Sequence, residues 1–347
     1  MTTTPAGLAI EATGLRKSYG DQVVLNGIDL AVPEGTIFSL LGPNGAGKTT
    51  VVQILSTLIN ADGGEMRVAG HDLATAPDAV RAAIGVTGQF SAVDNLLTGT
   101  ENLLLMADLH HLGRAAGRRR AADLLGQFDL ADAAGKLAGT YSGGMRRRLD
   151  LAMTLVGNPR LIFLDEPTTG LDPASRAEVW DAVRRLVAGG TDVLLTTHYL
   201  DEADELADHV VVIDHGRAIA SGTLPELKAS VGRDVIEVAV ADPALLGAAE
   251  RILAHRAGST PALDAGGRHA RARTADGAAD LGRVIRDLAE AGIAVEEIGL
   301  RRPTLDEVFL ALTGEAAAPP TATGPESAGH ETTEPNATAC YREGIPR

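Results

Sequence analysis

The chain contains 347 residues, 45% of them hydrophobic, and its 46 acidic residues outnumber its 31 lysines and arginines, giving a formal net charge of −15. This length is enough for one large domain and a smaller one, and the negative charge argues against nucleic acid as the main partner. Because Cys340 is the only cysteine, disulfides cannot hold the fold, and a reducing cytoplasm is the expected compartment.

The N-terminus carries no sign of an export signal. It reads Met-Thr-Thr-Thr-Pro and lacks the basic and apolar regions of a signal peptide. No apolar stretch elsewhere approaches the length of a membrane span. We therefore expect a protein that is soluble, or that attaches to a membrane through another protein.

The first part of the chain predicts short strands separated by turns. The last of them, Ile37–Leu41, is an almost continuous apolar run, which is typical of a buried strand. After residues 42–50, apolar side chains recur at the spacing of a helix. The earlier strands are expected at residues 9–12, 23–25 and 28–32, and the helical positions are Val51, Val52, Ile54, Leu55 and Leu58.

Between this strand and this helix lies Gly-Pro-Asn-Gly-Ala-Gly-Lys-Thr-Thr, residues 42–50, here called the phosphate-binding loop. Glycines let its backbone bend tightly and direct N–H groups at phosphate oxygens, and the N-terminus of the following helix adds roughly half a positive charge. Lys48 is expected to reach the β- and γ-phosphates, and the Thr49 hydroxyl to coordinate Mg²⁺. The chain is therefore predicted to bind a nucleoside triphosphate. The residues of the loop are Gly42, Pro43, Asn44, Gly45, Ala46, Gly47, Lys48, Thr49 and Thr50.

Farther along the chain, strands at residues 65–68 and 84–86 precede a leucine- and alanine-rich stretch, 92–135, whose periodicity is helical. From Ser142 onward, helices and strands alternate. That alternation implies a mainly parallel sheet covered on both faces. The expected helices end at residue 156 and span 173–188 and 200–207, and the expected strands span 161–165, 193–196, 209–214 and 217–221.

The strand at 161–165 ends in a pair of carboxylates, Asp165-Glu166, followed by Pro167, which stops the strand. Asp165 is the expected partner of Mg²⁺, and Glu166 is the candidate for polarising an attacking water. Taken alone, such a pair could equally be a solvent-exposed strand end. The phosphate-binding loop upstream favours a catalytic pair.

A domain boundary is expected near residues 224–234. Beyond it, the pattern predicts a small α/β domain that ends in a helix at 304–312. Residues 315–347 are too polar to bury a core, so this tail is expected to be disordered. The predicted domains are thus 8–224, 234–313 and the tail. The remaining elements of the small domain are expected at 235–240, 243–254, 269–273, 278–291 and 295–298.

Ser142-Gly143-Gly144 opens a helix between the loop and the carboxylate pair. With these three motifs, the chain from about Ile10 to Gly222 resembles the ATP-binding subunits of ABC transporters. The segments 141–149 (YSGGMRRRL) and 305–310 (LDEVFL) look like the daunorubicin/doxorubicin-resistance branch, which exports antibiotics. The resemblance implies an α/β fold, in which a P-loop ABC ATPase domain with a mixed sheet and a helical insert precedes the small C-terminal α/β domain.

The resemblance also implies roles for single residues. Tyr19 matches the aromatic residue that stacks on adenine, although a tyrosine at a strand end could equally edge the core. Gln89 matches the glutamine that touches Mg²⁺ and water, and Asp172 lies in the segment that crosses to the partner subunit. His198 matches the histidine that holds the γ-phosphate and the attacking water, and Ser142, Gly143 and Gly144 match the residues that meet phosphate. Tyr141 and Met145 depart from the leucine and glutamine that are usual in the family.

For the family fold, the phosphate-binding loop and Ser142 lie too far apart in one chain to meet one γ-phosphate. The resemblance therefore implies a homodimer formed on ATP binding, with Mg²⁺, in which each copy completes the other's site. It also implies a separate integral-membrane permease and a peripheral location on the cytoplasmic face of the cell membrane. The contact surface is expected after Gln89, at Phe90, Val93, Leu96 and Leu97, although these apolar residues could equally be core.

Two other functions are considered. One is a non-transport ATP switch of the same fold, acting on ribosomes or DNA. Its ribosomal members carry two nucleotide domains and its DNA-maintenance members carry long inserts, neither of which this chain has. The other is a module that holds nucleotide without hydrolysing it, which Glu166 and His198 argue against. Arg146, Arg147 and Arg148 either attract acidic partner groups or are simply exposed.

Overall fold

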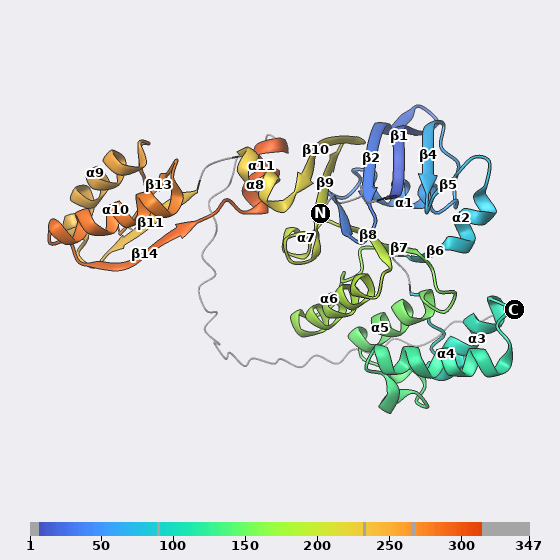
Figure 1. Ribbon diagram of the computed structural model, residues 1–347. Helices are drawn as coiled ribbons and strands as arrows, with labels where there is room; N and C mark the ends of the chain where they lie inside the picture. The colour runs from blue at the N-terminus through green and yellow to red at the C-terminus, as the bar shows by residue number, and fades with distance from the viewer. Residues whose placement is uncertain (1–6, 89–90, 232–233, 265–267, 314–347) are drawn as a thin grey trace, which may run out of the picture. The chain divides into compact units, whose positions relative to one another are not determined.

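The computed structural model describes residues 7–313 except 89–90, 232–233 and 265–267 (Figure 1). The predicted tail 315–347, Cys340, Gln89 and Phe90 therefore lie outside the described residues. The described strands form three sheets. Within the described ranges, no helix combines the length and the apolar character needed to cross a membrane.

The first sheet is antiparallel and has the strand order β2-β1-β4-β5. Its two longest strands exceed the predicted segments because they continue through bulges next to Gly14 and Gly27, whose φ angles are +63° and +79°. Glycine adopts these angles without strain, so pairing resumes after each bulge. The strands are β1 (Leu8–Tyr19), β2 (Gln22–Pro33), β4 (Gly63–Val68) and β5 (His71–Asp72).

The second sheet has six strands in the order β10-β9-β3-β8-β7-β6, and all neighbouring pairs except β10–β9 are parallel. The predicted mainly parallel sheet is thus present. Because parallel strands end at the same edge, the segments that follow β3, β7 and β8 meet there. The strands are β3 (Ile37–Leu41), β6 (Ile84–Thr87), β7 (Leu161–Asp165), β8 (Asp192–Thr197), β9 (His209–Asp214) and β10 (Arg217–Thr223).

This six-stranded sheet separates two hydrophobic cores. Along β7, Ile162 and Leu164 belong to the core that contains α5 and α6, whereas Leu161 and Phe163 belong to the core that contains α1 and the antiparallel sheet. Side chains of a strand alternate between faces, so a continuous apolar run serves both cores. The sheet is covered on both faces, as predicted.

Apart from α2, which was not predicted, the helices of this part follow the predicted order. The predicted helical insert forms α3 and α4, which pack together and contact α5 (Figure 1). Thr98 and Glu101 form a capping box that starts α3. The helices are α1 (Lys48–Leu55), α2 (Pro77–Ala83), α3 (Gly99–Leu109), α4 (Arg114–Gln127), α5 (Gly143–Thr154), α6 (Pro173–Ala188) and α7 (Leu200–Leu206), with short 3₁₀ turns at Ala131–Ala133 and Ala138–Thr140.

The C-terminal part has its own antiparallel sheet, β12-β13-β11-β14, and its own core with α9 and α10. A helix that was not predicted, α8 (Leu224–Val231), occupies the expected boundary. Leu305 and Val308 of the last helix pack with Ala203 of α7 and Leu227 of α8. The other elements are β11 (Val235–Val240), a 3₁₀ turn (Pro243–Leu245), α9 (Leu246–Ala257), β12 (Ala262–Leu263), β13 (His269–Arg273), α10 (Gly277–Glu290), β14 (Val295–Arg301) and α11 (Leu305–Thr313).

Candidate functional site

The phosphate-binding loop connects β3 to α1, as the sequence predicts. Gly45 and Gly47 have φ angles of +83° and +106°, a region that other residues rarely adopt. A Cβ atom at Gly42 would lie 2.1 Å from the carbonyl oxygen of Ile213. Pro43 and Asn44 are exposed, Ala46 is buried and Thr50 is half-buried. The loop therefore requires glycine at three positions. Gly45 and Gly47 provide the backbone conformation, and Gly42 leaves room for the carbonyl oxygen of Ile213.

Lys48 lies under this loop with only 5% of its side chain exposed. Its Nζ donates hydrogen bonds to the carbonyl oxygens of Gly42 (2.8 Å) and Pro43 (3.1 Å), and it lies 3.9 Å from Oε1 of Glu166. Burial lowers the pKa of Lys48, while Glu166 and Asp165 oppose that shift. A positive charge is thus held between the loop and the carboxylate pair, where phosphate oxygens could replace its carbonyl partners.

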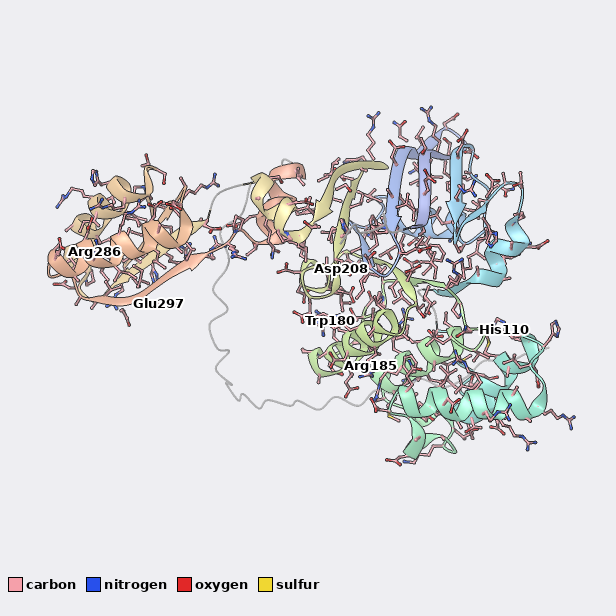
Figure 2. The ribbon with its side chains drawn as sticks, in the orientation of Figure 1. His110, Trp180, Arg185, Asp208, Arg286 and Glu297 are labelled. Carbon is pink, nitrogen blue, oxygen red and sulfur yellow. The ribbon has the colours of Figure 1, made fainter. Side chains whose placement is uncertain are left out.

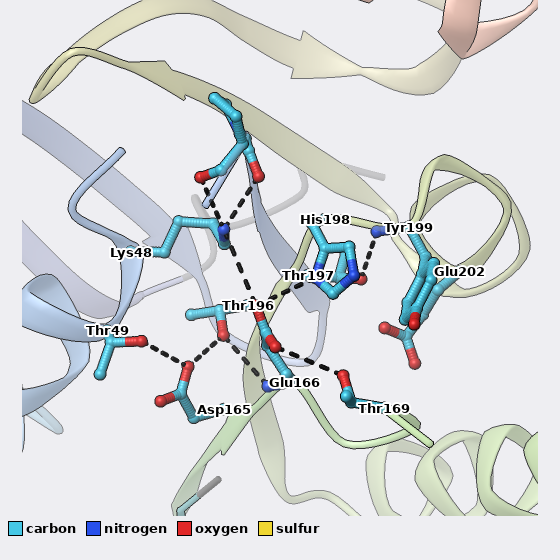
Figure 3. Close-up of polar contacts among 12 residues, drawn as sticks. Lys48, Thr49, Asp165, Glu166, Thr169, Thr196, Thr197, His198, Tyr199 and Glu202 are labelled. Carbon is cyan, nitrogen blue, oxygen red and sulfur yellow. Dashed lines mark hydrogen bonds and ion pairs between the residues drawn. The ribbon is translucent and has the colours of Figure 1, made fainter. Parts of the chain in front are cut away.

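The Thr49 hydroxyl meets Asp165 at the end of β7 (Figure 3). Its Oγ1 donates to Oδ1 of Asp165 at 3.2 Å, and the hydroxyl of Thr196 donates to the same oxygen. Mg²⁺ prefers hard oxygen ligands and is commonly held by one or two protein groups together with phosphates and water. A hydroxyl and a carboxylate beside a phosphate-binding loop fit that description, so Thr49 and Asp165 could hold Mg²⁺.

Glu166 and His198 also meet at this edge (Figure 3). Nδ1 of His198 lies 3.0 Å from Oε1 of Glu166, and the Thr169 hydroxyl donates to Oε2 at 3.3 Å. The backbone of Glu166 has a φ of +48°, which is uncommon for a residue with a side chain. Its N–H donates to the carbonyl of Thr196 at 3.1 Å. Surrounding groups therefore hold an unfavourable conformation that directs this carboxylate toward Lys48 and His198.

On its other side, the His198 ring packs at a tilt of 39° against the ring of Tyr199, with 4.1 Å between the centroids, and Arg176 lies 4.8 Å from the centroid of the Tyr199 ring. Glu202 of α7 is completely buried behind them. Its Oε1 accepts hydrogen bonds from Thr168 (2.8 Å) and from the indole of Trp180, which Figure 2 labels on α6 (3.2 Å). These contacts join the segment that follows β7 to the segment that follows β8.

Ser142 and Asp172 lie elsewhere, at the starts of two helices. Ser142 caps α5 by accepting from the N–H of Met145 at 3.2 Å, and Asp172 caps α6 by accepting from the N–H of Ser175 at 2.9 Å. The second of these bonds holds the pKa of Asp172 below its ordinary value. Ser142, Gly143 and Asp172 are exposed. Among the described residues, no hydrogen bond joins these groups to the phosphate-binding loop.

The remaining predicted residues are placed as follows. Tyr19 ends β1 with 51% of its surface exposed, and Nζ of Lys17 lies 5.5 Å from its ring centroid. Val93, which was considered for a partner surface, is buried in the core with α3 and α4, whereas Leu96 is 83% exposed. Gln89 and Phe90 lie outside the described residues.

The interpretation that Arg147 and Arg148 are simply exposed on the surface is wrong, because each is only 9% exposed. Nε of Arg147 donates to the carbonyl of Pro167 at 2.7 Å, and its Nη1 donates to Asp150 at 3.1 Å. Burial lowers the pKa of Arg147 and raises the pKa of Asp150, and the attraction between them opposes both shifts. An arginine and an aspartate three residues apart on a largely apolar helix face could have indicated this pair from the sequence.

Comparison with known proteins gives a consistent result. Residues 25–169 match the family model described as ABC transporter, and residues 222–313 match the model described as ATP-binding protein DrrA1-3-like, C-terminal domain. The second match covers the small sheet, α9, α10 and α11. The two matches thus account for most of the described chain.

Among the curated relatives, the daunorubicin resistance ATP-binding protein DrrA2 of Streptomyces coeruleorubidus is 55% identical over 89% of this chain and 96% of its own length. The daunorubicin/doxorubicin resistance ATP-binding protein DrrA of Streptomyces peucetius is 50% identical over 91% of this chain and 96% of its own length. A solved ATP-binding subunit of an ABC transporter, 29% identical, superimposes with a TM-score of 0.57 over 65% of this chain and 93% of its own.

Proposed function

This chain belongs to the ATP-binding subunits of ABC transporters, and from that premise we propose that it hydrolyses Mg-ATP to export a hydrophobic drug or antibiotic through a separate integral-membrane subunit. The substrate class rests on relatives named for resistance to daunorubicin and doxorubicin. The proposed location is the cytoplasmic face of the cell membrane. The proposed domains are 8–224 and 234–313.

One observation carries the hydrolytic part of the proposal: Lys48, Glu166 and His198 converge beside the pair formed by Thr49 and Asp165. In the proposed reaction, a water polarised by Glu166 attacks the γ-phosphorus in line, the bond to the bridging oxygen breaks, and ADP and phosphate leave. His198 orients the water, and Lys48 stabilises the charge on the phosphate oxygens. Mg²⁺, when bound, neutralises phosphate charge, and the groups proposed to hold it are Thr49, Asp165 and Gln89.

The phosphate-binding loop, residues 42–50, is proposed to bind the triphosphate through its backbone N–H groups, and Tyr19 to stack on adenine. Ser142, Gly143, Gly144 and Asp172 are proposed to act on the nucleotide of a second copy. Support comes from the exposure of Ser142, Gly143 and Asp172 at the starts of α5 and α6 and from the absence, in the described ranges, of hydrogen bonds to their own loop. ATP would then hold two copies together, and hydrolysis would release them.

The membrane subunit is proposed to contact the segment around Leu96, whose side chain is 83% exposed. Large apolar side chains at that level of exposure are a reason to expect a partner when several lie together. Leu105, Leu109 and Leu137 of the helical insert are also exposed. Opening and closing of the dimer would move this insert and so reach the membrane subunit.

The hydrolytic proposal is tested with the purified full chain by phosphate release and by gel filtration in Mg-ATP. Glu166→Gln should lose turnover by about 100-fold or more while retaining ATP binding, since only water activation is removed, and it should elute as a dimer. Lys48→Ala should weaken nucleotide binding. A monomeric Glu166→Gln variant in saturating Mg-ATP, or unchanged affinity in Lys48→Ala, would contradict the proposed site.

The transport proposal is tested in cells that produce the chain together with an integral-membrane protein that co-purifies with it. The chain should sediment with membranes only when that protein is present, and the cells should accumulate less anthracycline. Cells carrying the Glu166→Gln variant are the control, because the complex should still form while export stops. Equal drug accumulation in cells with the wild-type chain and in cells with Glu166→Gln would argue for a function other than transport.

A further inference from the structure

We infer that Arg147 is a positioning residue for Glu166: its guanidinium holds the carbonyl groups on both sides of that carboxylate and ties them to helix α5. The inference rests on the proposed function, in which Glu166 polarises the attacking water. Arg147 touches neither the phosphate-binding loop nor Glu166's carboxylate in any hydrogen bond among the described residues. Its effect would therefore be indirect, through the backbone of the segment that follows β7.

The geometry of the guanidinium supports this role. Nε donates to the carbonyl of Pro167 at 2.7 Å, and Nη2 lies within hydrogen-bonding distance of the carbonyl of Asp165 at 3.4 Å. These two carbonyls belong to the residues immediately before and after Glu166. Arginine offers five N–H donors in a planar array, so one side chain can bond both.

The segment between these carbonyls needs such support. Glu166 has a φ of +48°, and a residue with a side chain persists in that region only when its surroundings over-determine it. Thr196 supplies one restraint by accepting from the Glu166 N–H. Arg147 supplies restraints on the flanking carbonyls from the opposite element, α5. Without them, we expect the carboxylate to sample several positions instead of one.

Asp150 holds the guanidinium in place and extends the connection. Its Oδ2 accepts from Nη1 of Arg147 at 3.1 Å, and its Oδ1 accepts from the N–H of Ala92 at 3.1 Å. Nη1 also donates to the carbonyl of Gly88 at 3.2 Å. The buried pair therefore joins three parts of the chain: α5, the residues around Glu166, and residues 88 and 92 of the segment that follows β6.

Arg148 is a matched control on the same helix. It is as buried as Arg147, but its partners are the carbonyl of Phe128 at 2.9 Å and Glu178 of α6 at 3.2 Å. None of its hydrogen bonds in the described ranges reaches residues 165–167 or 88–92. Removing Arg148 should therefore affect stability without moving Glu166.

The test compares two variants of the full chain. One is a double variant that combines Arg147→Met and Asp150→Leu, and the other is the control Arg148→Met. The double variant removes both members of the buried pair, which avoids leaving one buried charge unpaired. We expect its kcat for Mg-ATP to fall by at least about tenfold while its ATP Kd stays within about twofold. Arg148→Met should retain kcat even if its melting temperature falls. Arg147→Lys keeps the charge but not the planar array of donors, so its kcat should lie between those of the double variant and Arg148→Met.

A second comparison asks whether the loss acts through Glu166. In a Glu166→Gln background, adding the double variant should reduce the residual turnover by less than about twofold, because the group to be positioned is already gone. A kcat equal to wild type in a folded double variant would overturn the inference, and so would a full additional loss in the Glu166→Gln background. If wild type released no phosphate, the proposed function would fail instead.

Discussion

Glu202 shows how burial changes the chemistry of one residue near the candidate site. It is completely buried on α7 and accepts from Thr168 and Trp180. Burial raises the pKa of Glu202, and hydrogen bonds from Thr197, Thr168 and Trp180 oppose that shift. The folded chain therefore keeps this proton at a pH at which the unfolded chain has lost it.

The sign of the pH dependence follows directly. The contribution of protonated Glu202 to stability is fully present below the unfolded glutamate pKa, about 4.3, and is lost as the pH rises through the raised pKa. Glu202→Gln stays neutral and keeps an acceptor for Thr168 and Trp180. We therefore expect its melting temperature, relative to wild type, to increase between about pH 5 and pH 8.

Thermal unfolding at several pH values checks this expectation. Asp123→Asn, at an exposed position on α4, is the control for replacing a carboxylate by an amide and should change the melting temperature only slightly. A constant difference for Glu202→Gln across the whole range would mean that Glu202 is ionised in the folded chain.

The crossing of α5 and α6 is set by the absence of a side chain at Gly144. A Cβ atom there would lie 2.9 Å from Cβ and 2.8 Å from Oγ of Ser175 on α6. At Gly143, one position earlier, the nearest atom is Cδ2 of Leu171 at 3.3 Å, the end of a side chain that can move. A side chain at Gly144 would therefore collide with α6, whereas a side chain at Gly143 would meet only a side chain that can move.

We expect Gly144→Ala to lower the free energy of unfolding by about 1–3 kcal/mol, the usual cost of forcing atoms into a packed contact. Gly143→Ala should change it by less than about 1 kcal/mol, because the helical preference of alanine offsets a small adjustment of Leu171. Denaturant unfolding of both variants gives the comparison. Equal stability of the two would show that α6 moves away from α5 at little cost.

Ser142 has a structural task in addition to its proposed one. Its hydroxyl oxygen accepts from the N–H of Met145, so the start of α5 is ordered before any nucleotide arrives. An N-cap of this kind contributes about 1 kcal/mol to stability. A Ser142→Ala variant should therefore be judged by turnover after its folding has been measured.

At the scale of the whole molecule, the proposal requires two copies, because each nucleotide would lie between the loop of one copy and Ser142 of the other. Two inactive variants should then complement each other. In an equimolar mixture of Lys48→Ala and Ser142→Ala, half of the dimers pair unlike copies, and each such dimer has one intact site. We expect about a quarter of wild-type turnover, measured as phosphate release.

Each variant assayed alone is the control and should be close to inactive. The mixture should also include a period without nucleotide, so that subunits can exchange. If the mixture stayed as inactive as its components, although both were folded, the shared site would be ruled out. A chain that hydrolyses ATP as a monomer would instead leave Ser142→Ala active on its own, and Glu166→Gln would then elute as a monomer.

The amino-acid sequence alone determined the local features. The phosphate-binding loop, the carboxylate pair after β7 and nearly all helices and strands follow from spacing over a few residues, because loop conformation and amphipathic periodicity are local properties. The parallel sheet also followed, since alternation of strands and helices permits few arrangements. The helix at 77–83 was missed, as was the helix at 224–231, where a boundary was expected. β1 and β2 were predicted too short because glycine bulges interrupt their alternation.

Tertiary structure alone decided which distant residues touch. Thr49 and Asp165 are 116 positions apart, and His198 and Glu166 are 32 apart, yet strand order brings each pair to one sheet edge. The burial of Arg147, which the sequence left open to simple exposure, depends on how α5 packs against the segments around residues 88 and 166. Such contacts depend on the packing of separate elements, and no pattern within one element contains that information.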